Sequence, residues 1–494
     1  MSEQILVIGN GMVGHHFVAT LMRSGSGAVV TVVGEESRIA YDRVHLSEVF
    51  AGSDPEDLAL SSAQEYADWG VDLILGDRAV TIDRERRVVV TESGRELSFD
   101  ILVLATGSYP FVPSVPGHDQ AGCMVYRTLD DLERIRATAA RSRIGVVVGG
   151  GLLGLECANA VKNLGLETHV VEFAPGLMGV QLDDGASSML RRKIEDLGVR
   201  VHTRRNTQRI VAGESTTLRL EFDDGQQLST DMVVFSAGIR PRDELARSSG
   251  LDIGERGGIV IDEQCRSSDP GIYAIGECAL YKGRIFGLMA PGYRMAEVVA
   301  GDVAGISGSF TGADMSTKLK LLGVDVGGIG DAHGRSEGSV ALLYADRKAA
   351  TYKRLVVSSD GRRLLGAALV GDCSDYDTLL QYYLHEIELP EDPAGLIVPN
   401  GDAAISLDAL PPSAAVCRCH NVSKAQIIAA IEAGSGSLAA VKKATCASTG
   451  CGGCAALVQQ LVDDHGADMT VTEAEVTPLK RAKTVLAEPS RRSA

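Results

Sequence analysis

Short apolar runs followed by glycine-rich turns dominate the N-terminal half of the chain. Residues 5–8 predict a buried strand, a helical stretch follows to about residue 23, and a second apolar run at 29–33 ends close to Glu35. The glycines of the turn between strand and helix are Gly9, Gly11 and Gly14. Strand, glycine turn, helix, strand and acid occur in the order and spacing of a dinucleotide-binding unit.

The same pattern occurs a second time further along the chain. An apolar run at residues 144–148 precedes a helical stretch to 164, and a strand at 168–171 ends at Glu172. The glycines of this second turn are Gly149, Gly151 and Gly154. The chain is therefore expected to contain two dinucleotide-binding domains.

Three further apolar strands end in glycine turns. The first ends at Ala105, Thr106 and Gly107, the second at Gly238, and the third, at residues 272–275, at Gly276 and Glu277. We interpret the first two as crossovers between domains, because in each a proline follows the glycine turn.

The pattern changes beyond residue 310. Short β-type runs at 324–329, 340–344, 350–357 and 364–370, followed by a helix at 376–384, predict a small α+β domain. The segment Pro411-Pro412-Ser413 predicts a linker to a cysteine-containing module that extends to about 466, and the polar residues 480–494 are expected to be disordered.

Composition and charge narrow the class of protein. The formal net charge of −17 makes nucleic acid and an anionic membrane poor partners. No apolar run approaches the roughly 18 residues that a membrane-spanning helix needs, and no signal peptide precedes the first strand, so a cytoplasmic location is expected. In that setting clustered cysteines more often bind metal than form disulfides. The isolated cysteines, expected to be small buried residues, are Cys123, Cys157, Cys265, Cys278 and Cys373.

The two glycine turns carry specific chemistry. The first glycine of each allows the tight turn, the second lets the backbone approach a pyrophosphate, and the third lets the helix pack on the strand. Glu35 is positioned to bind a ribose hydroxyl pair. Glu172 would bind a free 2′-hydroxyl and repel a 2′-phosphate, and no arginine occurs in residues 173–176. NADH is therefore predicted in preference to NADPH at the second turn.

Four cysteines near the C-terminus form two close pairs. Cys417-x-Cys419 and Cys451-x-x-Cys454 could together hold a zinc ion or an iron–sulfur cluster. A C-x-C pair is less usual in zinc sites. An electron donor expected on the same chain favours an iron–sulfur cluster at this site. Cys446 could act as a fifth ligand, although a buried structural role is expected. Between the pairs, Ser423 and Gln426 predict a capping box at the start of a helix over 422–431.

Taken together, the order of these motifs over residues 1–310 resembles the two-dinucleotide flavoprotein family, which includes glutathione, rubredoxin and nitrite reductase-like members. The resemblance implies FAD on the first unit and NAD(P)H on the second, with Glu277 on a ribityl hydroxyl. The segment 41–47, which contains Arg43, resembles the part of nitrite reductase-like members that lies beside the flavin. Residues 35–60 contain no cysteine, so thiol chemistry at the flavin is not expected and no catalytic side chain is required.

The C-terminal module resembles the bacterioferritin-associated ferredoxin-like [2Fe–2S] domain. This resemblance maps the four cluster ligands onto Cys417, Cys419, Cys451 and Cys454. The predicted fold class is thus α/β, with two Rossmann-like domains, a small α+β domain and a small helical [2Fe–2S] domain. The expected boundaries are 1–112 with 240–310 for FAD, 113–239 for NADH, 311–405 for the α+β domain and 413–466 for the cluster.

The whole arrangement resembles the N-terminal half of the large subunit of assimilatory NADH nitrite reductase and the electron-transfer subunit of assimilatory nitrate reductase. Because no sirohaem domain follows before residue 494, we expect the nitrate system, with electrons passing from NADH to FAD, to [2Fe–2S] and to a molybdenum-containing catalytic subunit. The alternatives are an NADH–ferredoxin or rubredoxin reductase, a nitrite reductase component, and an iron- or redox-responsive partner protein.

Overall fold

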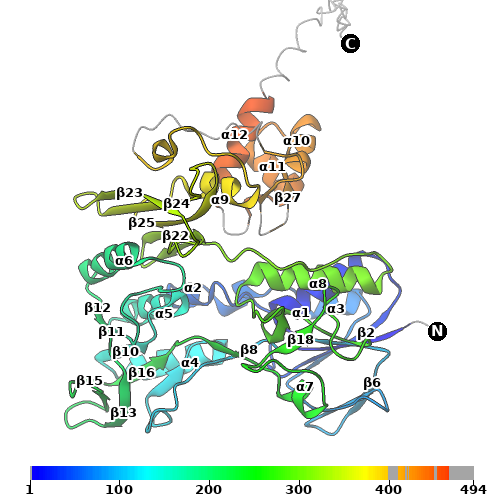
Figure 1. Ribbon diagram of the computed structural model, residues 1–494. Coiled ribbons are helices and arrows are strands. Elements are labelled where there is room, and N and C mark those ends of the chain that lie inside the picture. Colours follow the sequence, from blue (N-terminus) through cyan, green and yellow to red (C-terminus); the bar gives the residue numbers. More distant parts are fainter. Residues whose placement is uncertain (1–2, 399–409, 418–419, 421, 450–452, 467–494) are drawn as a thin grey trace, which may run out of the picture. The chain divides into compact units, whose positions relative to one another are not determined.

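The computed structural model describes residues 3–398, 410–417, 420, 422–449 and 453–466. The chain divides into two compact units, Met1–Ala404 and Ile405–Ala494. The first contains two five-stranded parallel sheets, a five-stranded antiparallel sheet and several smaller sheets, and the second is small and mainly helical (Figure 1). The predicted fold class is confirmed.

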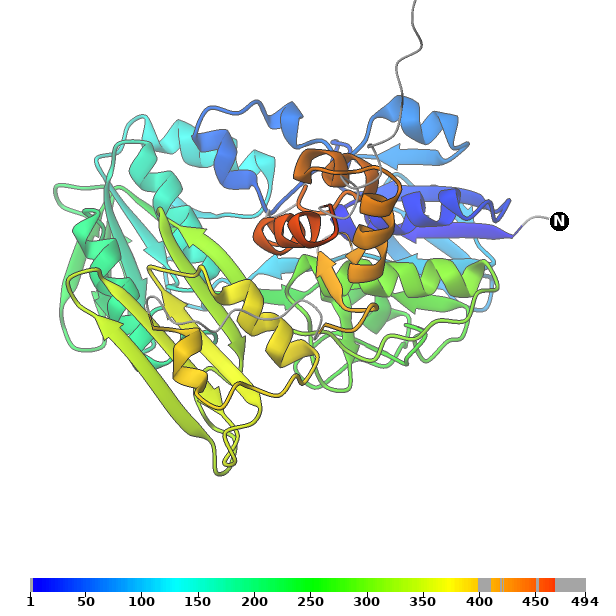
Figure 2. The ribbon, with the colours of Figure 1, turned by 90° about the horizontal axis from the view of Figure 1, so that it is seen from above.

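The first parallel sheet carries the first glycine turn. Its part of the chain contains β1 (Gln4–Ile8), α1 (Met12–Arg23), β2 (Val29–Gly34), α2 (Leu46–Phe50), η1 (Pro55–Leu58), α3 (Ala63–Asp68), β3 (Asp72–Leu75), β4 (Ala79–Asp83), β5 (Val88–Thr91), β6 (Glu96–Ser98), β7 (Ile101–Leu104), α7 (Glu244–Ser248), β18 (Ile259–Ile261), β19 (Ile272–Ala274), η2 (Gly276–Cys278), β20 (Ala279–Tyr281) and α8 (Met289–Val303). The strands pair in the order β19-β7-β1-β2-β3, and Ile5 of β1 pairs with Val30 and Ile101 on either side. Helices α1 and α8 lie against each other (Figures 1 and 2) and share a core with this sheet. The apolar strands are buried for this reason.

The second parallel sheet repeats this plan. Its elements are β9 (Cys123–Val125), α4 (Leu129–Ala139), β10 (Ile144–Val148), α5 (Leu152–Asn163), β11 (Glu167–Glu172), α6 (Asp184–Asp196), β12 (Arg200–Thr203), β13 (Thr207–Ala212), β14 (Leu218–Phe222), β15 (Gln227–Thr230) and β16 (Met232–Phe235). The strand order is β12-β11-β10-β16-β9, which places β10 and its glycine turn at the centre. Two short antiparallel strands, β8 (Ser108–Pro110) and β17 (Ile239–Pro241), form the crossover between the sheets.

The small domain is an antiparallel sheet with one helix. Its elements are β21 (Thr317–Leu321), β22 (Val324–Gly330), β23 (Val340–Asp346), β24 (Thr351–Val357), β25 (Leu364–Val370), α9 (Tyr376–Leu384) and η3 (Pro393–Leu396). The strands pair in the order β21-β22-β25-β24-β23. The four predicted strands and the helix are present, and β21 is the strand that the sequence analysis missed. Lysines alternate with leucines in β21, as is usual for an edge strand, and the run is too polar to detect alone.

Asp183, just before α6, ties the second parallel sheet to the small domain. It caps α6 by accepting from the Ala186 N–H, and it accepts from Tyr352 Oη at 2.7 Å and Arg354 Nη1 at 2.9 Å, both on β24. Asp183→Ala removes a helix cap worth about 1 kcal/mol. It also takes the ion-pair partner from Arg354 and the acceptor from the Tyr352 hydroxyl, which costs about 1.5–3 kcal/mol. We expect the free energy of unfolding in urea to fall by about 3 kcal/mol. The exposed neighbour, in Asp184→Ala, should lower it by less than about 1 kcal/mol; equal losses would contradict the assignment.

The second unit is built from short helices. Its elements are β26 (Ala415–Cys417), β27 (Val422–Ser423), α10 (Lys424–Glu432), α11 (Leu438–Thr445) and α12 (Ala455–Gly466). The three helices, orange to red in Figure 2, pack together around buried Ile427, Val441 and Val458. The predicted capping box is present, since Ser423 accepts from the Gln426 N–H and Gln426 accepts from the Ser423 N–H. Residues 480–494, expected to be disordered, lie outside the described residues.

Among the described residues, no helix is both long enough and apolar enough to cross a bilayer.

Candidate functional site

The first glycine turn has the geometry of a dinucleotide-binding turn. Gly9 has a φ of +112°, and a Cβ there would lie 2.2 Å from the carbonyl oxygen of Ala105. A Cβ on Gly14 would lie 2.1 Å from the oxygen of Gly9, so strand and helix meet without room for a side chain. Gly11 differs, because nothing lies within 4 Å of its Cβ position at the start of α1. The space at Gly11 and the free N–H groups of the helix fit a pyrophosphate.

The second glycine turn reproduces this geometry. Gly149 has a φ of +123°, and its Cβ would lie 2.2 Å from the oxygen of Ser236. A Cβ on Gly154 would lie 2.0 Å from the oxygen of Gly149, whereas Gly151 again faces open space. Both turns therefore need glycine for packing at two positions and for ligand access at the third.

The two acids at the strand ends have different surroundings. Glu35 forms an ion pair with Arg242, whose guanidinium lies 4.4 Å from the centre of the Tyr109 ring. Glu172 is buried and accepts hydrogen bonds from the N–H of Gly150 at 2.6 Å and of Ala174 at 2.8 Å. Glu172 thus holds the second glycine turn in place while its negative charge stays beside the predicted ribose position.

The structure also brings two arginines to this position that the sequence analysis did not consider. The N–H of Arg204 donates to the oxygen of Ala174 at 3.0 Å, and the N–H of Arg205 donates to the oxygen of Glu172 at 3.1 Å. Arg205 is paired with Asp224, whereas the Arg204 residue is exposed. The backbone of both arginines therefore lies next to the Glu172 loop, and these residues directly follow β12 rather than Glu172.

The crossover motifs lie against the first turn. Thr106 donates from Oγ1 to the oxygen of Arg242 at 2.7 Å, and Gly107 has a φ of +72° and accepts from the Arg242 N–H. Gly238 has a φ of +108° and accepts from the Phe111 N–H at 2.8 Å. These bonds join Ala105, Thr106 and Gly107, the motif predicted on the FAD side, to the residues that flank β17.

Glu277 and Arg43 are both held by charged partners. Glu277 accepts from Ser108 Oγ at 2.7 Å and from Arg127 Nη2 at 2.5 Å. Gly276, just before it, has a φ of +78° and packs against Val13 at the start of α1. Arg43 forms an ion pair with Glu36, to which the Tyr41 hydroxyl also donates at 2.7 Å. Burial raises the pKa of the Tyr41 phenol, which keeps it a hydrogen-bond donor.

Two of the four predicted cluster ligands are described, and they lie together. The thiols of Cys417 and Cys454 are buried, and their mutual hydrogen bond lowers the pKa of Cys417 while raising that of Cys454. Ser448 Oγ lies 3.0 Å from Cys454 Sγ. Cys419 and Cys451 lie outside the described residues. Within the described part of the chain, no group of three or more candidate ligands is arranged to hold a metal ion.

Neighbouring residues support the thiol pair. Backbone N–H groups of Ser448 and His420 donate to the sulfur of Cys417 and help to lower its pKa. His420 is exposed and its Nε2 lies 3.0 Å from Thr449 Oγ1. Buried sulfurs that face backbone N–H groups are the surroundings that stabilise thiolates and cluster charge.

Two expectations about the other cysteines were wrong. Cys446 is exposed rather than buried, because it ends α11 in a left-handed conformation with a φ of +61° that turns the chain toward Ser448. Cys123 is only half-buried, since β9 is the edge strand of its sheet. The other isolated cysteines, Cys157, Cys265, Cys278 and Cys373, are buried as predicted.

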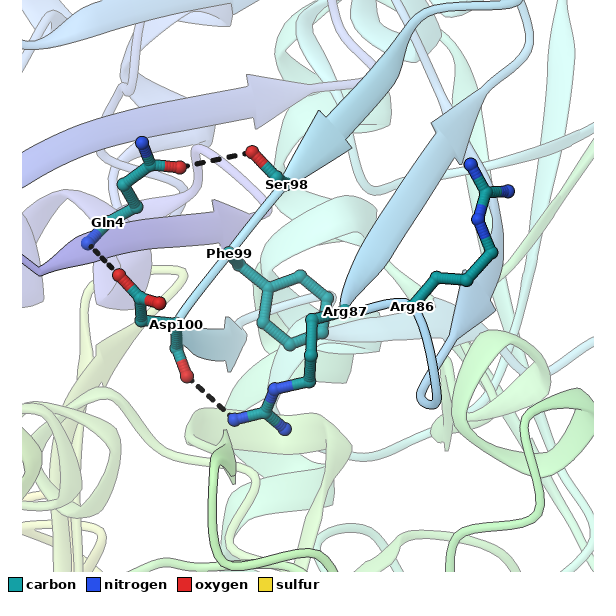
Figure 3. A pocket seen from close by; sticks show the side chains of 6 residues that line it. All are labelled: Gln4, Arg86, Arg87, Ser98, Phe99 and Asp100. Atoms are coloured by element: carbon teal, nitrogen blue, oxygen red, sulfur yellow. Dashed lines mark hydrogen bonds between the residues drawn. The ribbon is translucent and has the colours of Figure 1, made fainter.

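A shallow hollow of about 320 Å³ lies elsewhere on the first unit and is drawn in Figure 3. It is lined by Gln4, Arg86, Arg87, Ser98, Phe99 and Asp100. Gln4 begins β1, so the hollow lies at the amino end of the sheet, away from the carboxyl ends where dinucleotides bind. Its arginines are neutralised by Glu96 and Asp269. The hollow is therefore not part of the candidate site.

Comparison with known proteins agrees with this geometry. Residues 3–300 match the family model of pyridine nucleotide-disulphide oxidoreductases. The chain belongs to this family. Residues 316–386 match the rubredoxin NAD+ reductase C-terminal domain, and residues 415–464 match the BFD-like [2Fe-2S] binding domain. This oxidoreductase therefore uses FAD and NADH and carries a [2Fe–2S] cluster.

Two relatives are named for the reduction of nitrite and of nitrate. The chain is 55% identical to the nitrite reductase [NAD(P)H] large subunit of Klebsiella oxytoca, covering 95% of this chain and 50% of that protein. It is 32% identical to the assimilatory nitrate reductase electron transfer subunit of Bacillus subtilis, covering 94% of this chain and 60% of that protein. The chain thus spans about half to three fifths of the length of these relatives. The crystal structure of the ferredoxin reductase for the CYP199A2 system of Rhodopseudomonas palustris is similar, with a TM-score of 0.73 at 26% identity over 81% of this chain and 98% of that one.

Proposed function

We propose that this oxidoreductase takes hydride from NADH and delivers single electrons, through FAD and its [2Fe–2S] cluster, to a reductase of nitrite. When bound, the flavin accepts two electrons together and releases them singly, which nicotinamide does not do. The observation that carries the proposal is the buried thiol pair of Cys417 and Cys454, on a chain whose flavin side has no cysteine over residues 35–60. Electrons that cannot leave through a disulfide need the cluster as their exit.

The residues of the first unit have separate roles in this proposal. FAD is held by Gly9, Gly11, Gly14, Glu35, Arg43, Ala105, Thr106, Gly107, Gly276 and Glu277. NADH is held by Gly149, Gly151, Gly154, Glu172 and Gly238. The open positions at Gly11 and Gly151 support pyrophosphate binding at both turns. We assign residues 1–112 with 240–310 to the FAD domain, 113–239 to the NADH domain and 311–405 to the α+β domain.

The residues of the second unit hold the cluster in this proposal. We assign the domain to residues 413–466 and the ligands to Cys417, Cys419, Cys451 and Cys454. The adjacency of Cys417 and Cys454, one from each sequence pair, supports this assignment. The chain's own contribution is to bury the sulfurs and to offer them backbone N–H donors.

The electron acceptor is nitrite in the first version of the proposal. The support is the 55% identity with a nitrite reductase large subunit over nearly the whole chain. The second version is the nitrate system, with a molybdenum-containing catalytic subunit as partner, and its support is the similarity to the nitrate reductase electron transfer subunit over 94% of the chain. Both versions place the reaction in the cytoplasm, where NADH is available.

One experiment distinguishes these versions. A tagged chain is purified from its native cells with whatever copurifies, and NADH-driven loss of nitrite and of nitrate is measured beside molybdenum and iron analysis. Loss of nitrite supports the first version, and loss of nitrate with molybdenum present supports the second. If NADH bleaches the flavin but neither anion is consumed, and added ferredoxin or rubredoxin is reduced instead, the acceptor is a soluble carrier and both versions are wrong.

Cofactor preference provides a further prediction. Glu172→Gln removes a negative charge that would repel a 2′-phosphate, and the backbone of Arg204 lies beside the Glu172 loop. Like charges at close range cost several kcal/mol. We expect the ratio of kcat/KM for NADPH to that for NADH to rise about tenfold or more. Steady-state kinetics with both nucleotides measure this ratio. In the double variant with Arg204→Ala the gain should be lost; a gain that persists would show that Arg204 does not contact the 2′-phosphate.

A further inference from the structure

Strand β23 is an outer strand of the antiparallel sheet in the small domain (Figure 1). All of its residues, Val340–Asp346, pair with β24 in an unbroken register. Within the described part of the chain, no strand pairs with its other side. The backbone N–H and C=O groups on that side are therefore available to another strand. The proposed function makes no use of them.

The features that usually keep edge strands from pairing are missing from β23. The opposite edge of the same sheet, β21, carries Lys318 and Lys320, and lysines on an edge oppose the approach of a second strand. β23 contains no lysine, arginine or proline, and no bulge interrupts its pairing with β24. Its one charged residue, Asp346, ends the strand and accepts from the N–H groups of Lys348 and Ala349 in the hairpin turn. The two edges of this sheet therefore differ, and only β21 is protected.

The side chains of β23 are apolar and exposed. Leu343, at the middle of the strand, is 61% exposed, and Val340 at its start is 48% exposed. Ala341 and Ala345, which share a face of the sheet with Leu343, are exposed as well. An exposed leucine between two alanines leaves room for the side chains of a neighbouring strand, and burial of this row would be favourable.

The charges beyond the two ends of β23 are opposite in sign. Glu337 precedes the strand, and Arg347 and Lys348 follow it in the hairpin turn. All three are exposed, and none of them forms an ion pair with another residue that the structure describes. When two identical strands pair antiparallel, the start of each lies beside the end of the other. The charges around β23 are therefore complementary to those of a second copy of this chain.

The hydrogen-bond pattern restricts the register of such a pair. The two residues of a hydrogen-bonded antiparallel pair exchange both of their bonds, so a residue that faces outward has to meet another that faces outward. In two copies of one strand, the two-fold axis then passes through a residue. An axis at Leu343 gives the longest overlap, with Leu343 opposite itself and Val340 opposite Asp346 of the second copy. Arg335 lies beyond the second copy's hairpin turn in this register.

We propose that β23 is a dimerisation strand, through which two copies of this chain pair antiparallel about a two-fold axis at Leu343. The pairing joins two five-stranded sheets into one continuous sheet, and the two Leu343 side chains cover each other. Glu337 of each copy lies near Arg347 and Lys348 of the other, as a self-complementary interface requires. One strand pair buries less surface than a permanent dimer does, so dimer and monomer are in equilibrium.

The first test measures this equilibrium by sedimentation velocity on the full chain with its cofactors, over about a hundredfold range of concentration. The unchanged protein should shift from monomer to dimer. Leu343→Lys places two like charges opposite each other and removes the apolar contact, so the dissociation constant should rise about 10²-fold or more. Lys320→Glu, on the opposite edge of the sheet, should leave it unchanged. The flavin spectrum and Tm should be the same in all three proteins, because the glycine turns belong to other sheets.

Charge reversal tests the contacts at the ends of the strand. Glu337→Lys alone and Lys348→Glu alone should each weaken the dimer about threefold to tenfold, as expected for two exposed ion pairs. The double variant exchanges the charges and should regain the dissociation constant of the unchanged protein. High salt should reduce these differences. If the double variant is as weak as the sum of the single changes, Glu337 and Lys348 do not meet and the proposed pairing is wrong.

Crosslinking tests the position of the axis. Residues directly opposite in an antiparallel pair have Cβ atoms about 4.5–5.5 Å apart, so Leu343→Cys should form a disulfide between two chains on mild oxidation. Val340→Cys should not, because its two copies would lie about 20 Å apart. Both are made together with Cys446→Ser, since Cys446 is exposed.

The outcomes that overturn the proposal are a protein that stays monomeric at every concentration, a dimer that survives Leu343→Lys, and crosslinking at Val340 in place of Leu343. A monomer that instead binds a different protein through β23 also overturns it. None of these measurements depends on whether NADH reduces the cluster, so the proposed function and this dimer can fail separately.

Discussion

Replacing Cys417 with serine will abolish reduction of the cluster by NADH and leave bleaching of the flavin unchanged. Cys417 is buried against Cys454, and a serine oxygen is a poor ligand for iron that prefers thiolate. Iron content should fall from about two atoms per chain to near zero. Iron analysis and electron paramagnetic resonance of the NADH-reduced protein measure the loss. Ferricyanide, which can take electrons from flavins directly, should still be reduced at the original rate.

A matched control is available in the same module. Cys446 is exposed and ends α11, so Cys446→Ser should keep its iron and its cluster signal. A cluster that survives in Cys417→Ser would show that Cys417 is not a ligand. A cluster lost in Cys446→Ser would instead make Cys446 one of the four ligands.

Replacing Gly151 with valine will block reduction of the flavin by NADH while the protein folds and keeps its FAD. The backbone at Gly151 is extended, with a φ of −83°, so any residue can adopt it. Nothing lies within 4 Å of the Cβ position, so the side chain projects into the space where the pyrophosphate approaches. We expect kcat/KM for NADH to fall by about 10³-fold or more, as when a ligand and a side chain compete for one volume. Stopped-flow bleaching by NADH, with dithionite reduction as the comparison, measures the effect.

The corresponding change in the first turn should have the complementary result. Gly11→Val also meets open space and extended backbone, and we expect it to fold but to lose FAD. If Gly151→Val loses FAD and Gly11→Val loses only the response to NADH, the assignment of the two nucleotides to the two sheets is reversed. If neither change has an effect, the glycine turns are not the binding sites.

Much of this architecture could be predicted because its signals are local. A strand, a glycine turn and a helix are defined by neighbouring residues, and the steric need for Gly9 and Gly149 follows from backbone approach at the turn itself. The capping box of Ser423 and Gln426 is equally local. The strand β21 was missed because an edge strand with alternating lysines has too little apolar signal of its own.

Contacts between distant parts of the chain could not be predicted in this way. Arg242 pairs with Glu35 across 207 residues, and Arg127 reaches Glu277 across 150. Arg204 approaches the Glu172 loop because β12 lies next to β11 in the sheet, and strand order is not encoded by residues near Glu172. The exposure of Cys446 depends on the left-handed end of α11, where a cysteine is unusual. These features arise from tertiary structure rather than from local sequence.

Under the proposed assignment of Glu35 to FAD, the ion pair between Glu35 and Arg242 would connect FAD affinity with the freedom of the two nucleotide-binding domains to move. Arg242 follows β17, one of the two strands that cross between the sheets, and its guanidinium rests on Tyr109 of the other crossover strand. A ribose that bonds to Glu35 therefore acts on the same carboxylate that anchors this crossover. Thermodynamic reciprocity then applies: any change in domain orientation that strengthens or weakens this ion pair alters the affinity for FAD, and FAD alters the population of that orientation by the same factor.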